Sequence, residues 1–214
     1  GHDERVAQLG EECTRLREQA GAAAQKLSAA RQKAAGQLDK AVTQNLQDLG
    51  MKGASFSTSL TQGDLTAHGI DKVAFQLAAN KGEPGAPLHK VASGGEISRV
   101  MLAMKTVFAD ADTIPVLLFD EIDAGVGGAV ARQVGQKLAK LGRTHQVICI
   151  THLPQIAAQA AAHYNVRKRS ARGRTTTDVT PVADAERVEE VARLLDGSLS
   201  DVSLEHARAL LAER

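Results

Sequence analysis

Two adjacent carboxylates, Asp120 and Glu121, follow the apolar run of "VLLFDE". A short apolar run without polar alternation is typical of a strand buried in a parallel sheet, and ligands of such sheets bind beyond the carboxyl ends of the strands. At that place Asp120 could hold Mg²⁺ through water, and Glu121 could orient or deprotonate a water that attacks a phosphate. The alternative is a solvated acidic loop that caps the helix expected from residue 126.

A second apolar run, "QVICIT", ends in Thr151 and is followed by His152. If the two runs are neighbouring parallel strands, Thr151 and His152 lie at the same sheet edge as Asp120. A histidine there could donate to a phosphate or to the attacking water. Taken singly, a histidine just before a helix-starting proline is more often a packed or capping residue. The other histidines and the two cysteines give no metal-ligand spacing.

The segment "VASGGEIS" sets Ser93, Gly94 and Gly95 just before a helix that begins near Glu96. Two glycines let the backbone come close to a ligand, and the free N–H groups of a first helical turn attract an anion. These features favour a phosphate site. Taken alone, Ser-Gly-Gly-Glu is also an ordinary helix N-cap, which is the commoner case.

Asp123 and Gly125 belong to the turn that follows the Asp-Glu pair. One interpretation makes them loop and cap residues only. The other places them where they reach a neighbouring active site. The residues alone leave both open.

The elements that position these residues form an α/β pattern. Segments "SFSTSL" and "KVAFQLAA" alternate with period two and predict an antiparallel layer, with turns at Gly63-Asp64 and His68-Gly69. The apolar runs at 115–120 and 146–151 are separated by a helix and predict a parallel sheet covered on both faces. The remaining predictions are helices at 96–109 and 126–141, an Ala-rich helix after residue 153, a hairpin around Ser170-Ala171-Arg172-Gly173, and helices at 188–195 and 204–211 with Gly197 ending the first.

Residues 3–49 contain no proline and carry a heptad pattern. At 1.5 Å per residue this helix would reach about 70 Å, which is longer than a compact domain of the remaining chain needs. We therefore expect its first part to pair with a helix outside the chain, the alternative being an amphipathic helix that lies on its own globule. The apolar positions are Val6, Leu9, Cys13, Leu16, Ala20, Ala23, Leu27, Ala30 and Ala34, then Leu38, Val42, Leu46 and Leu49.

Composition excludes several classes of protein. With 43% hydrophobic and 24% charged residues the chain resembles an ordinary globular protein, and a net charge of +1 argues against a general nucleic-acid coat. No apolar run of about 18 residues and no signal segment is present, so we expect a cytoplasmic protein with no membrane contact. Local charge is concentrated in one segment, where a DNA backbone contact and a solubilising strand edge are both open interpretations. The cations are Arg167, Lys168, Arg169, Arg172 and Arg174.

The order of these motifs resembles the second half of an ATP-binding-cassette (ABC) ATPase. The resemblance implies ATP and Mg²⁺ as ligands. Its implied roles are a signature loop at Ser93, Gly94, Gly95 and Glu96, a Walker B aspartate at Asp120, a catalytic glutamate at Glu121, a D-loop residue at Asp123 and a switch histidine at His152.

Longer segments are similar to the RecN family of SMC-like ATPases, which act in bacterial DNA double-strand break repair: "PLHKVASGGEISRVMLAMK", "LLFDEIDAGVGG" and "QVICITHLPQIAAQA". The resemblance implies the C-terminal lobe of an ABC-type head at 51–214, after the returning helix of a coiled-coil arm at 1–50. It further implies an N-terminal P-loop lobe of the same protein as partner, a homodimer through the heads, DNA binding and a nucleoid-associated location.

One motif of that family, the P-loop G-x-x-x-x-G-K-[S/T], does not occur in this sequence. We expect it in the N-terminal lobe, and we expect this chain alone to be inactive. Two other functions stay open at this point. A non-catalytic coiled-coil scaffold would not need Glu121 and His152, and a transporter's nucleotide-binding subunit gives no reason for the heptads.

Overall fold

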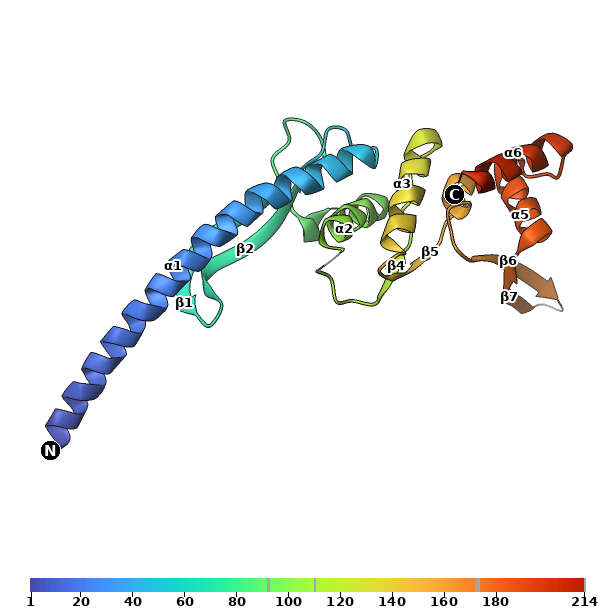
Figure 1. Cartoon of the computed structure of the whole chain (residues 1–214). Helices are drawn as coiled ribbons and strands as arrows, with labels where there is room; N and C mark the ends of the chain where they lie inside the picture. Colours follow the sequence, from blue (N-terminus) through green and yellow to red (C-terminus); the bar gives the residue numbers. More distant parts are fainter. Residues whose placement is uncertain (92, 110, 172–173, 214) are drawn as a thin grey trace. The chain divides into compact units, whose positions relative to one another are not determined.

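The computed structural model describes residues 1–91, 93–109, 111–171 and 174–213, without the side chains of residues 171 and 174 (Figure 1). The chain forms two compact units, one of Gly1–Gln44 with Gly53–Val91 and one of Asn45–Lys52 with Ala92–Arg214. Contacts thus group residues 53–91 with most of the long helix. The boundary predicted along the sequence at residue 50 stays a prediction.

The first unit contains most of the long helix α1 (His2–Asp48) and an antiparallel sheet. The sheet has the order β1-β2-β3, with strands at Ser55–Thr66, Gly69–Ala78 and Ala86–Pro87. The predicted antiparallel layer is confirmed, but the turn expected at Gly63-Asp64 is wrong. That dipeptide lies inside β1, where the pairing with β2 shifts register between Gln62 and Thr66. Among the described residues no helix is both long and apolar enough to cross a membrane.

One side of the β1–β2 hairpin packs against the second half of α1 (Figure 1). The Phe56 amide donates to Thr43 Oγ1 at 3.0 Å, and Thr58 Oγ1 donates to Asp39 at 2.7 Å. The first turns of α1 differ, since Val6 is 56% exposed and Leu16 51%. The second half of α1 therefore lies on its own unit, whereas pairing of its first part with a helix outside the chain stays a prediction.

The second unit holds the two parallel strands. Its β4 (Val116–Phe119) pairs in parallel with β5 (Gln146–Cys149), in the register Val116↔Gln146 to Phe119↔Cys149. Helix α2 (Gly94–Phe108) precedes β4, α3 (Gly128–Leu141) connects the strands, and the short α4 (Pro154–Ala157) follows β5. This order confirms the predicted parallel pair with its crossover helix.

Only one face of this pair is covered within the described residues. Leu117 and Phe119 of β4 are buried, whereas Leu118 is 65% exposed. The exposed face is largely apolar: its other apolar members are Val116, Ile148 and Ile150, and Gln146 lies at its amino end. The prediction of a sheet covered on both faces therefore holds for one face only. The apolar runs of the sequence predict two apolar faces, but they do not predict which segment or partner covers each face.

The C-terminal part forms a hairpin and a helix pair. The predicted hairpin is confirmed as β6 (His163–Ala171) and β7 (Arg174–Val182), although Arg172 and Gly173 of its predicted turn lie outside the described residues. Helix α5 (Asp184–Asp196) ends at Gly197, whose φ of 72° is the left-handed conformation that glycine favours. Helix α6 (Asp201–Ala212) begins with a capping box and packs on α5 through Val191, Ala192 and Ala207.

Candidate active site

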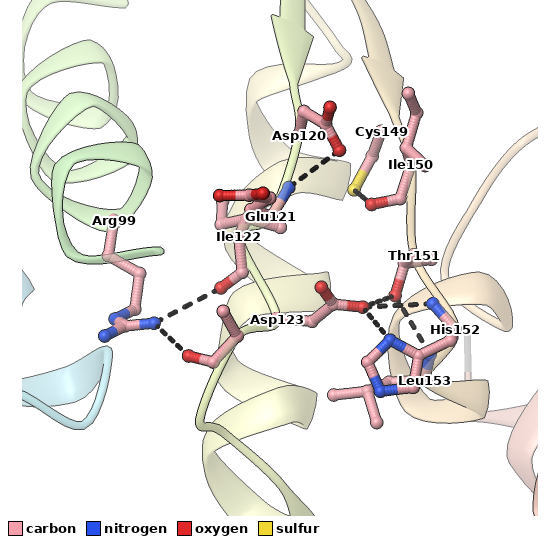
Figure 2. Close-up of polar contacts among 11 residues, drawn as sticks. Arg99, Asp120, Glu121, Ile122, Asp123, Cys149, Ile150, Thr151, His152 and Leu153 are labelled. Carbon is pink, nitrogen blue, oxygen red and sulfur yellow. Dashed lines mark hydrogen bonds and ion pairs between the residues drawn. The ribbon is translucent and has the colours of Figure 1, made fainter. Parts of the chain in front are cut away.

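The residue that follows β4 is hydrogen-bonded to the second turn of α2. Asp120 follows the strand, and its Oδ1 accepts from the Glu121 amide at 2.9 Å (Figure 2). Ser98 of α2 donates from Oγ to the Asp120 carbonyl at 2.8 Å. Asp120 and Glu121 are both exposed. The two carboxylates can therefore reach a ligand while their backbone is held by a neighbouring helix.

Glu121 has an unusual backbone. Its φ is 55°, a left-handed conformation that non-glycine residues adopt only rarely and that often marks a functional site. A Cβ placed on Gly94 would overlap the Glu121 carboxylate, so that carboxylate lies against the first turn of α2. The positive end of a helix favours a carboxylate at this position.

The start of α2 is a capped helix end, and one of its two glycines has a packing role. Ser93 caps the helix, accepting from the Glu96 amide at 3.4 Å, which confirms the predicted N-cap. A Cβ on Gly95 would lie 2.8 Å from the Ala124 Cβ and 3.1 Å from the Glu121 carbonyl oxygen. Gly95 is thus required for close packing of α2 on the turn after β4, a role that the sequence analysis missed.

Asp123 joins the two strand ends. Its carboxylate is only 6% exposed, and its Oδ2 accepts from Thr151 Oγ1 at 2.6 Å and from the His152 amide at 3.0 Å (Figure 2). The same oxygen lies 3.0 Å from Nδ1 of His152, whose side chain is 76% exposed. The structure therefore brings Asp123 and His152 together, as expected for residues that follow two neighbouring parallel strands.

Arg99 is a residue of this site that sequence reasoning missed. Its Nη1 donates to the Ala124 carbonyl at 2.9 Å and to the Ile122 carbonyl at 3.5 Å, so α2 holds the turn on both sides of Asp123. Burial is the main cause that lowers the pKa of Arg99, and Glu96 partly opposes it. An arginine four residues after Gly95 carries no signal by itself in a single sequence.

Cys149 is the last residue of β5 and is half-buried. Burial raises the pKa of its thiol to about 12, and the negative charges of Asp123 and Asp120 add to the shift. A thiol with this pKa stays protonated at neutral pH and is a poor nucleophile. The chemistry of the site therefore belongs to the carboxylates and the imidazole.

The predicted residues fall into two groups that meet at the end of the β4–β5 pair. One is the start of α2, with Ser93, Gly94, Gly95 and Glu96, and the other is the pair of strand ends, with Asp120, Glu121, Asp123 and His152. In the described part of the chain no three His, Cys, Asp or Glu side chains are close enough to hold a metal ion. Asp120 alone still suits Mg²⁺, which often binds one carboxylate together with water and phosphate oxygens.

The fold and the order of these strand ends define a mixed α/β protein with a parallel strand pair, its crossover helix and a C-terminal hairpin, preceded by a long helix. No protein-family model matches the sequence. Curated relatives are more informative. DNA repair protein RecN of Deinococcus radiodurans is 47% identical over 189 residues, which are 88% of this chain and 33% of the relative. RecN of Halalkalibacterium halodurans is 39% identical over 98% of this chain and 38% of the relative.

The chain belongs to the RecN family of DNA repair proteins. It spans about a third of the length of the curated relatives that it matches. Among solved structures, the Smc head domain with a coiled coil and joint from Pyrococcus yayanosii is 22% identical over 86% of this chain and 30% of that one. Its TM-score is 0.49.

Proposed function

We propose that this chain is the C-terminal half of an SMC-like ATPase head that acts in bacterial DNA double-strand break repair, with ATP bound and hydrolysed between two paired heads. The observation that carries the proposal is the joint placement of Asp120, Glu121 and His152 at the ends of two adjacent parallel strands. Their side chains are exposed beyond the carboxyl ends of the strands, which is where ligands of parallel sheets bind.

Each residue has a distinct task in this proposal. Glu121 orients or deprotonates the attacking water, and His152 hydrogen-bonds the phosphate or that water. Asp120 holds Mg²⁺ through water, and the ion, when bound, neutralises charge on the phosphates. Ser93 and Gly94 at the start of α2 contact the nucleotide that the partner head carries.

The N-terminal lobe of the same protein is the proposed partner that completes the site. Two surfaces support this partner: the exposed apolar face of β4 and β5, and the exposed apolar stripe in the first turns of α1. Large exposed apolar surfaces mark interaction sites, and about two thirds of each relative's length lies outside this chain. The lobe would supply the P-loop and cover the sheet, and its outgoing helix would cover the stripe.

Pairing of heads, DNA binding and a cytoplasmic, nucleoid-associated location follow from the same proposal. Membership of a DNA repair family supports DNA as a partner. A transporter subunit is disfavoured, because this family membership and the long helix α1 both fit an arm of a repair ATPase instead.

The proposal is tested by measuring phosphate release from this chain, from the N-terminal lobe and from their mixture. We expect negligible release from this chain alone and Mg²⁺-dependent release from the mixture, because only the mixture has both a P-loop and Glu121. Robust hydrolysis by this chain alone would contradict the half-site. An inactive mixture that still forms stable paired heads would favour the scaffold instead.

A matched pair of variants tests the role of the signature loop. Ser93→Arg places bulk and charge where the partner's nucleotide docks, so ATP-dependent pairing of heads should be lost, as measured by light scattering. Ser198→Arg, which changes a serine in the exposed connection between α5 and α6, is the control and should leave pairing intact. Normal pairing in the Ser93 variant would exclude the cross-dimer role.

A further inference from the structure

One carboxylate oxygen holds the whole turn that carries His152. Asp123 Oδ2 lies within 3.0 Å of three donors that follow β5: Thr151 Oγ1, the His152 amide and His152 Nδ1. Thr151 Oγ1 in turn accepts from the Leu153 amide at 3.0 Å. The segment after β5 is therefore wrapped around a nearly buried acidic group (Figure 2).

The contact between Asp123 and His152 identifies the tautomer of the imidazole. An ionised carboxylate only accepts hydrogen bonds, so the ring nitrogen that faces it must carry the proton. In the neutral ring this leaves Nε2 as the nitrogen without a proton. Because the His152 side chain is 76% exposed, Nε2 is open to a ligand beyond the sheet.

The turn that presents Asp123 is itself fixed from α2. Arg99 donates to the carbonyls of Ile122 and Ala124, the two residues that flank Asp123. The Ala124 amide closes the turn by donating to the Glu121 carbonyl at 3.0 Å. A side chain held in this way keeps its orientation without a ligand.

We propose that Asp123 is a positioning residue for His152, which fixes the Nδ1-protonated tautomer and the ring orientation so that Nε2 faces the nucleotide. The role of His152 toward the nucleotide rests on the proposed function. The tautomer and the orientation rest on the geometry alone. Asp123 thus acts within its own chain, through an imidazole, and does not itself touch the reacting atoms.

The first test measures the tautomer of His152 by long-range ¹H–¹⁵N NMR of the 214-residue chain with ¹⁵N-labelled histidine, above the pH at which the ring titrates. The His152 signals are assigned by their loss in His152→Gln. We expect protonated Nδ1 in the unmodified chain. Asp123→Ala should shift the ring toward the Nε2-protonated form that free histidine favours. Thr151→Val is the matched control, since it removes another donor to Oδ2 and should leave the tautomer unchanged.

Two results would overturn the proposal: an Nε2-protonated ring in the unmodified chain, or the same tautomer with and without the Asp123 carboxylate. The first of these needs only His152→Gln, a change at an exposed side chain, for the assignment, so the test survives an Asp123 variant that fails to fold.

The second test measures ATP hydrolysis in a head that contains both lobes. Asp123→Asn should lower kcat about tenfold or more with little change in KM, because the amide can flip and offer a donor to Nδ1. In a His152→Ala background the same substitution should cost less than about twofold, because its target is gone. Two losses that simply multiply would contradict a positioning role. If the two-lobe head hydrolyses no ATP at all, the proposed function fails, while the tautomer measurement still decides the role of Asp123.

Discussion

The β4–β5 pair has an Asp–His pair at each end, and the two pairs differ in exposure. At the carboxyl ends, Asp123 is buried and the His152 side chain is 76% exposed. At the amino ends, Asp112 lies 3.9 Å from His145, whose side chain is only 2% exposed. Lys105 also forms an ion pair with Asp112, and its hydrogen bond is the main cause that lowers the pKa of that carboxyl group.

Residue type alone does not separate a reactive Asp–His pair from a structural one. Both ends combine a carboxylate with an imidazole. Only the carboxyl ends leave the imidazole open to a ligand, whereas the amino ends enclose it beside an ion pair. The comparison predicts loss of activity at one end and loss of stability at the other.

The largest effect is expected from Glu121→Gln in a head with both lobes. Hydrolysis should fall about 100-fold or more while ATP binding persists, because the amide keeps the shape but cannot act as a base. Phosphate release and nucleotide binding are measured on the same preparation. Asp112→Asn at the opposite end is the control, and its kcat should stay within about twofold of the unmodified head. An equal loss in both variants would contradict a functional difference between the two ends of the strand pair.

The two glycines at the start of α2 should differ in stability. Gly95→Ala should lower the free energy of unfolding by about 1–3 kcal/mol, because the new Cβ meets Ala124 and the Glu121 carbonyl group. Gly94→Ala should cost less than about 0.5 kcal/mol, because the new Cβ displaces only the flexible end of Glu121. Urea denaturation measures both. Equal losses would mean that the turn after β4 adapts more easily than its contacts indicate.

The amino end predicts a pH dependence of stability. The pKa of Asp112 is lowered from 3.8 in the folded chain, chiefly by Lys105. The ion pair therefore stabilises the fold above about pH 4, and this contribution is lost as the pH falls through the lowered pKa. The unmodified chain should unfold at higher urea than Asp112→Asn at pH 7, and the difference should shrink toward pH 3.

The exposed Asp196 at the end of α5 provides the control for that experiment. Asp196→Asn should show no comparable difference at either pH. If the difference in urea stability between the unmodified chain and Asp112→Asn stayed constant from pH 7 to pH 3, the pH dependence could not be assigned to the Asp112 carboxyl group.

The smallest effect is expected from the β6–β7 hairpin, which belongs to neither end of the parallel pair. Arg169 forms an ion pair with Asp178 at 3.0 Å, and Arg167 lies 3.9 Å from the buried Glu190. Arg172 and the side chain of Arg174 lie outside the described residues. A DNA backbone contact and a charged, unpaired strand edge both remain open interpretations of the cluster.

Lys168→Glu with Arg169→Glu separates these two interpretations. Arg167 is left in place, because a carboxylate there would repel Glu190. A DNA contact predicts weaker duplex binding and a salt slope reduced by about 2, from two lost phosphate contacts. Unchanged affinity and slope would leave the pair with a structural role, and Glu121→Gln, with both cations intact, serves as the control for DNA binding.

Much of the fold could be predicted from the sequence, because its signals are local. The apolar runs before Asp120 and Thr151 predicted two parallel strands, and Gly197 predicted the end of α5. The predicted Ala-rich helix after residue 153 is only one turn, Pro154–Ala157, because alanine favours a helix without requiring one. Gly63 failed as a turn signal because the register shift inside β1 depends on pairing with β2.

The sequence by itself determined the order of the elements and the residue types at the strand ends, because hydrophobic periodicity and chain polarity already place Asp120 and His152 at one sheet edge. Only the tertiary structure decided which carboxylate faces the imidazole and which glycine packs against backbone. Asp123 and His152 are 29 residues apart, and Arg99 reaches Ala124 across 25. Contacts over such separations depend on how the helices pack on the sheet, and no local pattern of residues records that packing.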